Sequence, residues 1–282
     1  MTLRDEKLIS IFSKVIDELP KRCPICKSEA VGYNKSNPLL MRCKWRACGK
    51  RFSFGECSPF FKSHIPLTMI LKILRMWLVK VELRSIAELL EISRQCVSSV
   101  VKKMKTQLVK SYYSNIERIG GPGIIVEIDE SKFGKVKYHR GHRVEGVWVF
   151  GMVERTPQRR IIFVPVENRK RETLIELLVK YVHPESTIHS DCWKAYNELS
   201  EYFNTHYTVN HSNNFVDPET NTHTNTIEGN WAGVKQQTAV SYRTKRFVEL
   251  HLIRYILKRN YGKDLAFKIF IRYLLLSPET PN

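Results

Sequence analysis

The sequence lacks any long hydrophobic run. No stretch of about 18 consecutive apolar residues is present, so a transmembrane helix is not expected. The first segment, MTLRDEKLISIF, has neither the basic start nor the apolar centre of a secretory signal peptide. Together these two absences predict an intracellular protein that does not enter a membrane.

Acidic residues are scarce relative to basic ones. The chain has 46 Lys and Arg against 28 Asp and Glu, which gives a formal net charge of +18. Residues 1–118 carry 23 of the basic residues but 10 of the acidic ones. A basic N-terminal half suits a polyanionic partner such as DNA, although solubility alone is the alternative explanation.

The cysteines do not suit a disulfide framework, because there are seven of them in a chain without secretory features. Two pairs, Cys23/Cys26 and Cys43/Cys48, have the spacing C-x2-C and C-x4-C with sixteen residues between them. Two such turns can present four thiolates to one tetrahedral zinc ion. A segment this short cannot build an adequate apolar core, so the metal would supply the folding energy. Because four protein ligands close the shell, the zinc is expected to be structural. The alternatives are four cysteines without metal, or Cys57 replacing one ligand.

Residues 66–104 have a pattern typical of a helix-turn-helix. An amphipathic helix is expected over 66–80, then a short helix, then a third helix capped by Ser93. The inward positions are expected to be Ile86, Leu89, Leu90, Val97, Val100 and Val101. If the third helix enters a major groove, the side chains nearest DNA are Arg94, Gln95, Ser98, Lys102 and Lys103. An ordinary helical hairpin is the alternative.

The sequence pattern changes at residue 124, where runs rich in β-branched residues begin and predict strands. The expected order is three strands, a helix, a strand, a helix, a strand and a helix that begins near Asn225. The expected strands cover 124–130, 147–153, 160–166, 186–191 and 206–211, with the first helix over 172–182. This order predicts an α/β domain with an RNase H-like fold.

Two of these strands end in an aspartate, Asp129 and Asp191. A lone carboxylate at a buried strand end is costly, so the pair suggests a bound cation. Glu228 lies on the following helix, and Lys235 shares its helical face two turns later. Three carboxylates suit Mg²⁺ (or Mn²⁺), which serves phosphoryl transfer on DNA.

Other charged residues near these aspartates are expected to have roles other than metal binding. Glu127 and Glu130 are expected to face solvent or to bind lysines; direct contact with the metal is the alternative for each. A basic hairpin beside the carboxylates is expected to contact DNA rather than to be a merely solvated turn, through Lys135, Lys137, Arg140 and Arg143.

Four segments of the chain closely resemble the Merlin family of DDE transposases and its bacterial insertion-sequence relatives. They are EIDESKFG at 127–134, HSDCWKAY at 189–196, VNHSNNFVDPET at 209–220 and HTNTIEGNWAGVK at 223–235. The resemblance covers most of residues 20–260. It implies an RNase H-like domain that performs cut-and-paste transposition at terminal inverted repeats.

The same resemblance implies roles for single residues. Asp129, Asp191 and Glu228 match the catalytic triad, and Lys235 matches the lysine that follows the family's glutamate. The chain departs from the pattern at Cys192 and Asn221, where glycine or another small residue is usual. Neither departure touches the triad.

Three regions are therefore expected: a zinc ribbon with an N-terminal helix over 1–60, a helix-turn-helix region over 61–118 and the catalytic domain over 119–282. The expected partner is double-stranded DNA, and two transposon ends favour a homodimer. The resemblance leans to eukaryotic members, which predicts a nuclear protein; in a bacterial host it would be cytoplasmic. The alternatives are a domesticated DNA-binding regulator that no longer cuts and an RNase H-like nuclease such as a junction resolvase.

Overall fold

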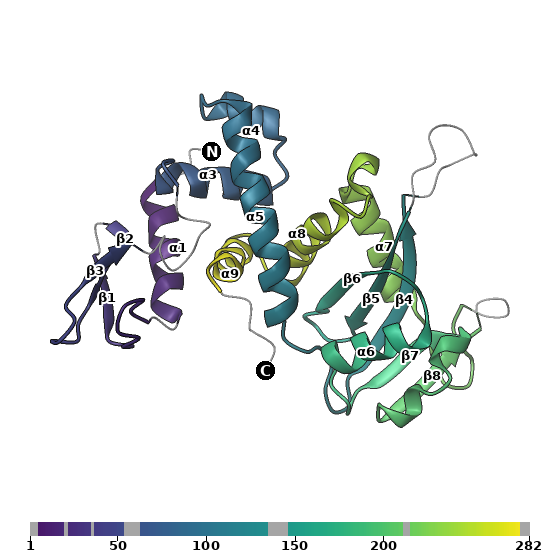
Figure 1. Ribbon diagram of the computed structural model, residues 1–282. Coiled ribbons are helices and arrows are strands. Elements are labelled where there is room, and N and C mark those ends of the chain that lie inside the picture. Colours follow the sequence, from purple (N-terminus) through teal and green to yellow (C-terminus); the bar gives the residue numbers. More distant parts are fainter. Residues whose placement is uncertain are drawn as a thin grey trace. The chain divides into compact units, whose positions relative to one another are not determined.

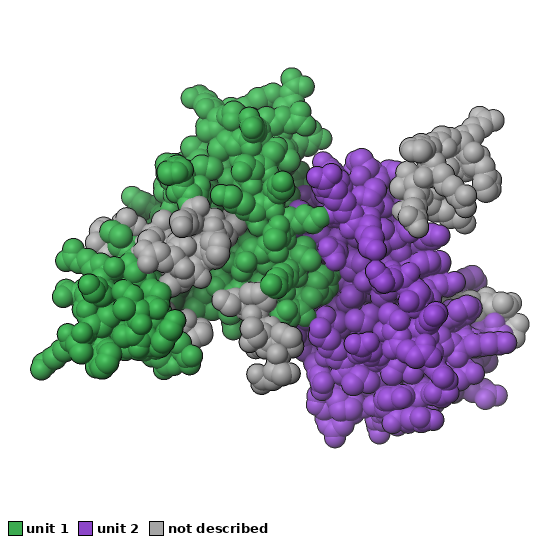
Figure 2. Space-filling model, viewed as in Figure 1, with its two compact units in different colours: residues 1–115, 263–282 green, residues 116–262 purple. Residues whose placement is uncertain are grey.

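The computed structural model describes residues 5–19, 22–34, 37–53, 63–134, 146–210 and 215–276. The chain divides into two compact units (Figure 2). Unit 1 contains residues 1–115 and 263–282, and unit 2 contains residues 116–262. The first boundary, after residue 115, lies three residues from the expected one, whereas residues 263–282 belong to unit 1 and not to the region expected to be catalytic.

Unit 1 begins with a helix and a small sheet (Figure 1). Helix α1 (Asp5–Glu18) buries Leu8, Phe12, Val15 and Ile16, which recur at helical spacing. The three-stranded antiparallel sheet follows in the order β1 (Val31–Asn34), β2 (Asn37–Cys43) and β3 (Arg51–Ser53).

Three helices follow in unit 1: α3 (Leu67–Leu78), α4 (Leu83–Leu89) and α5 (Arg94–Asn115). Pro66 precedes α3, as expected. The Ser93 hydroxyl accepts a hydrogen bond from the Cys96 N–H at 3.1 Å, so the expected cap of α5 is confirmed.

The inward face expected for α4 and α5 is partly wrong. Ile86, Val97 and Val100 are buried, but Leu89 is 65% exposed and Val101 is half-buried. Helix α4 has only seven residues, so Ile86 and the small Ala87 are enough to pack it against α5. The buried face of α5 continues at Met104 and Leu108.

The C-terminal helix α9 (Lys263–Leu275) packs against α1 and α5. Phe270 stacks on Trp77 of α3 with ring centroids 5.8 Å apart, and Lys268 pairs with Glu18 at 2.6 Å. These contacts between residues about 190 to 250 positions apart explain why the segment belongs to unit 1. Local sequence pattern cannot predict such a return of the chain.

Unit 2 is built on a mixed five-stranded sheet in the order β6-β5-β4-β7-β8 (Figure 1). The strands are β4 (Ile125–Phe133), β5 (Val147–Glu154), β6 (Ile161–Val166), β7 (Thr187–Asp191) and β8 (Thr205–Val209). The first three pair antiparallel, whereas β4–β7 and β7–β8 are parallel. The expected α/β class is confirmed.

Helices cover this sheet. Helix α7 (Asn225–Gln237) packs on β4 and β5, and α8 (Val248–Asn260) packs on β6 and α7. Helix α6 (Arg171–Tyr181) lies between β6 and β7 in the chain, one residue from its expected start. None of the helices in the described part of the chain is both long and apolar enough to cross a membrane.

The helix expected between the last two strands is replaced by two short 3₁₀ helices, η2 (Lys194–Tyr196) and η3 (Leu199–Glu201). Tyr196 and Leu199 are buried there.

Candidate functional site

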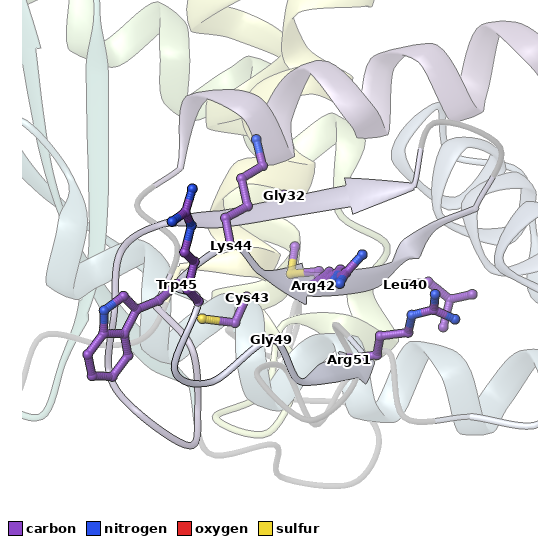
Figure 3. A pocket seen from close by; sticks show the side chains of 10 residues that line it. Gly32, Leu40, Arg42, Cys43, Lys44, Trp45, Gly49 and Arg51 are labelled. Carbon is purple, nitrogen blue, oxygen red and sulfur yellow. The ribbon is translucent and has the colours of Figure 1, made fainter.

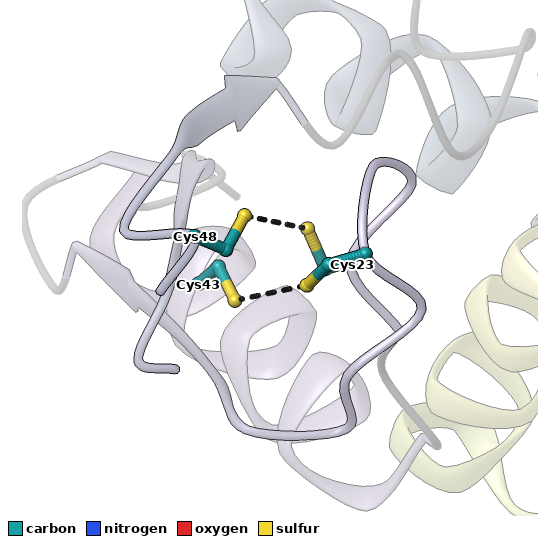
Figure 4. Close-up of side chains that lie close together, drawn as sticks. Cys23, Cys43 and Cys48 are labelled. Atoms are coloured by element: carbon teal, nitrogen blue, oxygen red, sulfur yellow. Dashed lines mark hydrogen bonds between the residues drawn. The ribbon is translucent and has the colours of Figure 1, made fainter. Parts of the chain in front are cut away.

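Four cysteines of unit 1 come together as their spacing predicts (Figure 4). The ligand atoms of Cys23, Cys26, Cys43 and Cys48 all lie within 4.8 Å of one another. The sulfurs of Cys23 and Cys48 are 3.8 Å apart, and those of Cys26 and Cys43 are 3.6 Å apart. A tetrahedral zinc ion with Zn–S bonds of about 2.3 Å requires sulfurs about 3.8 Å apart, so the donor set fits zinc.

Two turns of similar design hold these sulfurs. The residue that follows each cysteine pair has a positive φ: Lys27 after Cys26, and Gly49 after Cys48. In the first turn the Lys27 N–H donates to the Cys23 carbonyl at 2.9 Å. Backbone N–H groups of Cys26 and Ile25 lower the pKa of Cys23 to about 7, which favours the thiolate form that binds metal. Cys57, weighed as an alternative ligand, lies outside the described residues.

A basic hollow of about 780 Å³ lies beside the second turn (Figure 3). Its lining includes four exposed cations, and Trp45 is 52% exposed among them. These cations are Arg42, Lys44, Arg46 and Arg51. Exposed cations together with an exposed aromatic ring suit contact with a nucleic-acid backbone and its bases.

The α5 side chains expected to contact DNA are accessible. Arg94, Gln95, Lys102 and Lys103 are exposed, and Ser98 is half-buried. The basic hairpin residues Lys135, Lys137, Arg140 and Arg143 lie outside the described residues.

In unit 2 the parallel pairing of β4 with β7 aligns the two candidate aspartates. The register runs from Ile125↔Thr187 to Glu127↔His189. Asp129 and Asp191 each lie two residues beyond the last pair, at the same offset, and Asp191 is close enough for its charge to raise the pKa of Asp129. β7 ends at Asp191 as expected, but β4 continues to Phe133. The expectation that Asp129 ends a strand is wrong, because β5 remains paired with β4 after β7 has ended.

Trp231 of α7 holds Asp129. Its indole N–H donates to Oδ2 of Asp129 at 2.8 Å, while the Glu130 N–H donates to Oδ1 at 2.7 Å. The indole stacks on Phe163 with centroids 4.5 Å apart. Gly151, the β5 partner of Asp129, makes room for the indole, since a Cβ there would lie 2.7 Å from Trp231.

Helix α7 carries the other two candidate residues. Glu228 is in its first turn and accepts a hydrogen bond from the Thr224 hydroxyl at 2.9 Å. Lys235 donates to the Ser131 hydroxyl, and its Nζ lies 5.5 Å from the Phe133 ring centre. Burial and the charge of Arg243 lower the pKa of Lys235, whereas the charge of Asp129 raises it.

A buried carboxylate, Glu127, fixes α7 to the sheet. Glu127 is fully buried and accepts hydrogen bonds from Arg155 at 2.6 Å and from the Ile227 N–H at 2.9 Å. That N–H belongs to the first turn of α7, which has no side-chain cap of its own. Arg155 also donates to the His223 carbonyl at 2.6 Å. The expectation that Glu127 faces solvent or binds a lysine is therefore wrong, because it is buried and pairs with Arg155.

Two carboxyl groups at the end of the β4–β7 pairing, Asp129 and Glu130, have a raised pKa. Burial raises the pKa of Asp129 to about 6, and the negative charges of Asp191 and Glu228 contribute despite its two hydrogen bonds. Burial likewise raises the pKa of Glu130 to about 7, helped by Asp129 and Asp191. Glu130 is half-buried and accepts a hydrogen bond from Tyr196, so it does not simply face solvent.

These observations test the fit to a divalent cation. Asp129, Asp191 and Glu228 offer oxygen ligands, and burial together with the charges of the other two raises the pKa of Asp129, which disfavours its ionised form without a cation. Within the described part of the chain, the four cysteines form the one group of potential ligands within 4.8 Å of one another. The oxygen ligands of these three carboxylates therefore suit a hard cation, and their charges act on the pKa of Asp129. That they bind one cation together stays a prediction.

Comparison with known families adds independent evidence. The family model described as ISXO2-like transposase domain matches residues 118–263. This range spans just over half of the chain, nearly all of unit 2 and every carboxylate discussed above. No curated protein matches the chain.

Proposed function

The chain belongs to the ISXO2-like transposase family, and from that premise we propose that it cuts and joins DNA at the ends of a mobile element. The observation that carries the proposal is the alignment of Asp129 with Asp191 on neighbouring parallel strands, with Glu228 close enough to raise the pKa of Asp129. The strand order and the mixed pairing support an RNase H-like fold. The narrower Merlin assignment and a nuclear location stay predictions.

Asp129, Asp191 and Glu228 would hold Mg²⁺ (or Mn²⁺) in this proposal. When bound, such cations supply positive charge to the reacting phosphate and help to activate the attacking hydroxyl. The remaining work belongs to the chain itself. Trp231 keeps one oxygen of Asp129 in a fixed direction, and Thr224 does the same for Glu228.

Lys235 would add a positive charge on the DNA side of these carboxylates. Its ammonium is within electrostatic reach of Asp129 and is held by Ser131. A phosphate oxygen placed near Asp129 would therefore meet a cation that is already in position, which lowers the cost of organising the site.

Unit 1 would supply DNA binding. We propose that zinc, bound by Cys23, Cys26, Cys43 and Cys48, holds the fold that displays the basic hollow. We propose further that α4 and α5 act as a helix-turn-helix, with Arg94 or Gln95 reading bases and Lys102 or Lys103 contacting phosphates. A dimer would let one assembly hold two element ends.

The test of the proposed function is strand cleavage and joining on the repeats that flank the protein's own gene. Asp129→Asn, Asp191→Asn and Glu228→Gln should each abolish both reactions in Mg²⁺ and leave repeat binding nearly unchanged. Glu167→Gln, at a residue 82% exposed in the same unit, is the matched control and should retain activity. Wild-type protein that binds the repeats without cutting them in Mg²⁺ or Mn²⁺ would support the DNA-binding regulator instead.

The test of base reading is Arg94→Ala. It should reduce discrimination between the true repeat and a repeat with one changed base pair by about 1–3 kcal/mol. Lys102→Ala should weaken binding to all DNA sequences alike and reduce its salt dependence. Equal weakening of all sequences by Arg94→Ala would assign it a phosphate contact.

A further inference from the structure

An arginine in unit 2 lies between two tryptophans. The guanidinium of Arg169 is 4.0 Å from the ring centre of Trp148 and 4.8 Å from that of Trp193. Lys132, the β4 partner of Trp148, has its ammonium 5.5 Å from the Trp148 ring. Two aromatic rings and two cations therefore form one cluster, called here the tryptophan cluster: Lys132, Trp148, Arg169 and Trp193.

The tryptophan cluster adjoins the candidate carboxylates on the other face of the sheet from α7. Successive β4 side chains alternate between faces, so Asp129 meets Trp231 of α7 while Glu130 meets Tyr196. Arg169 is close enough to Glu130 to lower its pKa. Trp193 follows Asp191 by two residues, and its backbone N–H donates to Oδ1 of Asp191 at 3.0 Å, so the ring is attached to the chain next to the proposed reaction centre.

Trp193 remains 40% exposed although Arg169 covers part of it. An arginine clamp with only a structural purpose would gain most from a buried ring, because cation–π attraction is stronger when it is desolvated. An exposed tryptophan beside cations instead has the chemistry of a nucleobase platform, in which the ring stacks on the base and the cations neutralise phosphates.

A base inside a duplex already has both faces covered by its neighbours, so it cannot stack on a tryptophan without leaving the helix. We propose that Trp193 stacks on an unpaired base of the DNA strand whose phosphate lies at Asp191. Arg169 holds the ring in place, and Lys132 pairs with a neighbouring phosphate. This inference rests on the proposed function and adds a binding site for a single-stranded segment next to the cleavage point.

The experiment uses the full chain without divalent cations, so that binding is measured without cleavage. Three fluorescent probes share one duplex: a blunt end, a six-nucleotide thymidine overhang and a six-nucleotide abasic overhang. The two overhangs carry the same phosphates, and contacts of unit 1 with the shared duplex affect all three probes alike; any contact of unit 1 with overhang bases would persist in the Trp193 variants. The ratio of Kd values for abasic and thymidine overhangs therefore isolates base stacking.

Wild type should bind the thymidine overhang roughly 5- to 150-fold more tightly than the abasic one. Trp193→Ala should bring this ratio close to one, and so should Trp193→Leu, which keeps an apolar side chain if the alanine variant folds poorly. Trp193→Phe should retain most of the ratio because it keeps an aromatic face. Phe215→Ala removes another aromatic side chain of unit 2, 78% exposed, and should leave the ratio unchanged.

Two results would overturn the inference: a wild-type ratio near one, or a Trp193→Leu protein with the wild-type ratio. Absence of cleavage by wild type would instead count against the proposed function and would leave this ratio intact. The two failures are therefore distinguishable.

Discussion

The indole N–H of Trp231 donates a hydrogen bond to Oδ2 of Asp129 across a distance of 2.8 Å, from a helix to a strand 102 residues earlier in the chain. This contact links α7, which carries Glu228 and Lys235, to the strand that carries the first aspartate. Gly151 permits it by leaving space beneath the indole.

Trp231→Phe keeps an aromatic ring but removes the only hydrogen-bond donor of the side chain. Oδ2 of Asp129 should then lose the hydrogen bond that orients the carboxylate. Strand cleavage should fall about 10- to 100-fold, as for other residues that orient metal ligands. Higher Mg²⁺ concentrations should recover part of the activity, and DNA binding should not change. Equal cleavage by the variant and wild type at limiting Mg²⁺ would contradict this role.

Gly151→Ala should destabilise unit 2 because the new methyl group would collide with Trp231 and Ile227, both within 2.9 Å of the added Cβ. Such overpacking costs about 1–3 kcal/mol. The matched control is Gly229→Ala, which lies in α7 with open space around the new Cβ and should stabilise the helix by up to about 1 kcal/mol. Thermal unfolding of the two variants should shift in opposite directions; a shared direction would contradict the argument.

Glu127→Gln should be strongly destabilising, because it leaves Arg155 without its charged partner and weakens the cap of α7. Removing one member of a buried ion pair costs about 3–5 kcal/mol, and Glu127 is fully buried while Arg155 is 20% exposed. The Glu167–Lys245 pair, more than four-fifths exposed, is the control: Glu167→Gln should change stability by less than about 1 kcal/mol. Denaturant unfolding measures the stability of both variants. A similar loss of stability in both would contradict the role of the Glu127–Arg155 pair in fixing α7.

The pair formed by Glu154 and Arg160 predicts a pH dependence of stability. Burial alone would raise the pKa of Glu154, but hydrogen bonds from Arg160, the Gly120 N–H and Thr156 outweigh it and lower the pKa below its ordinary 4.5. A lowered carboxyl pKa stabilises the folded state above that ordinary value, and the stabilisation is lost as pH falls through the folded pKa. The Tm difference between wild type and Glu154→Gln should therefore be full near pH 7 and should shrink below about pH 4.5; a constant difference would show that the charge is irrelevant.

Purified protein should contain zinc, and Cys26→Ser should lower the zinc content and increase hydrogen exchange in residues 20–55. Cys96→Ser is the control, since Cys96 is a free cysteine outside the cluster and should leave the metal content unchanged. Zinc content that is equal in the two variants would exclude the four-cysteine site.

Much of this molecule follows from local sequence. The paired cysteine spacing predicted the four-sulfur cluster, because each short turn sets the geometry within its own pair and the β1–β2 hairpin between them brings the two turns together. The runs rich in β-branched residues form the strands of the sheet in unit 2, and Ser93 caps α5 as expected. Both features depend on residues only a few positions apart.

Other features were decided by tertiary structure alone. The sequence did not show that α9 returns to unit 1, that β4 continues past Asp129 alongside β5, or that Glu127 is buried under α7. Each depends on partners far away in the chain, and burial by a distant helix leaves no local periodicity. The carboxylate set shows both limits: the sequence located Asp129, Asp191 and Glu228, but only the parallel register of β4 and β7 and the packing of Trp231 against Gly151 bring their charges within reach of one another.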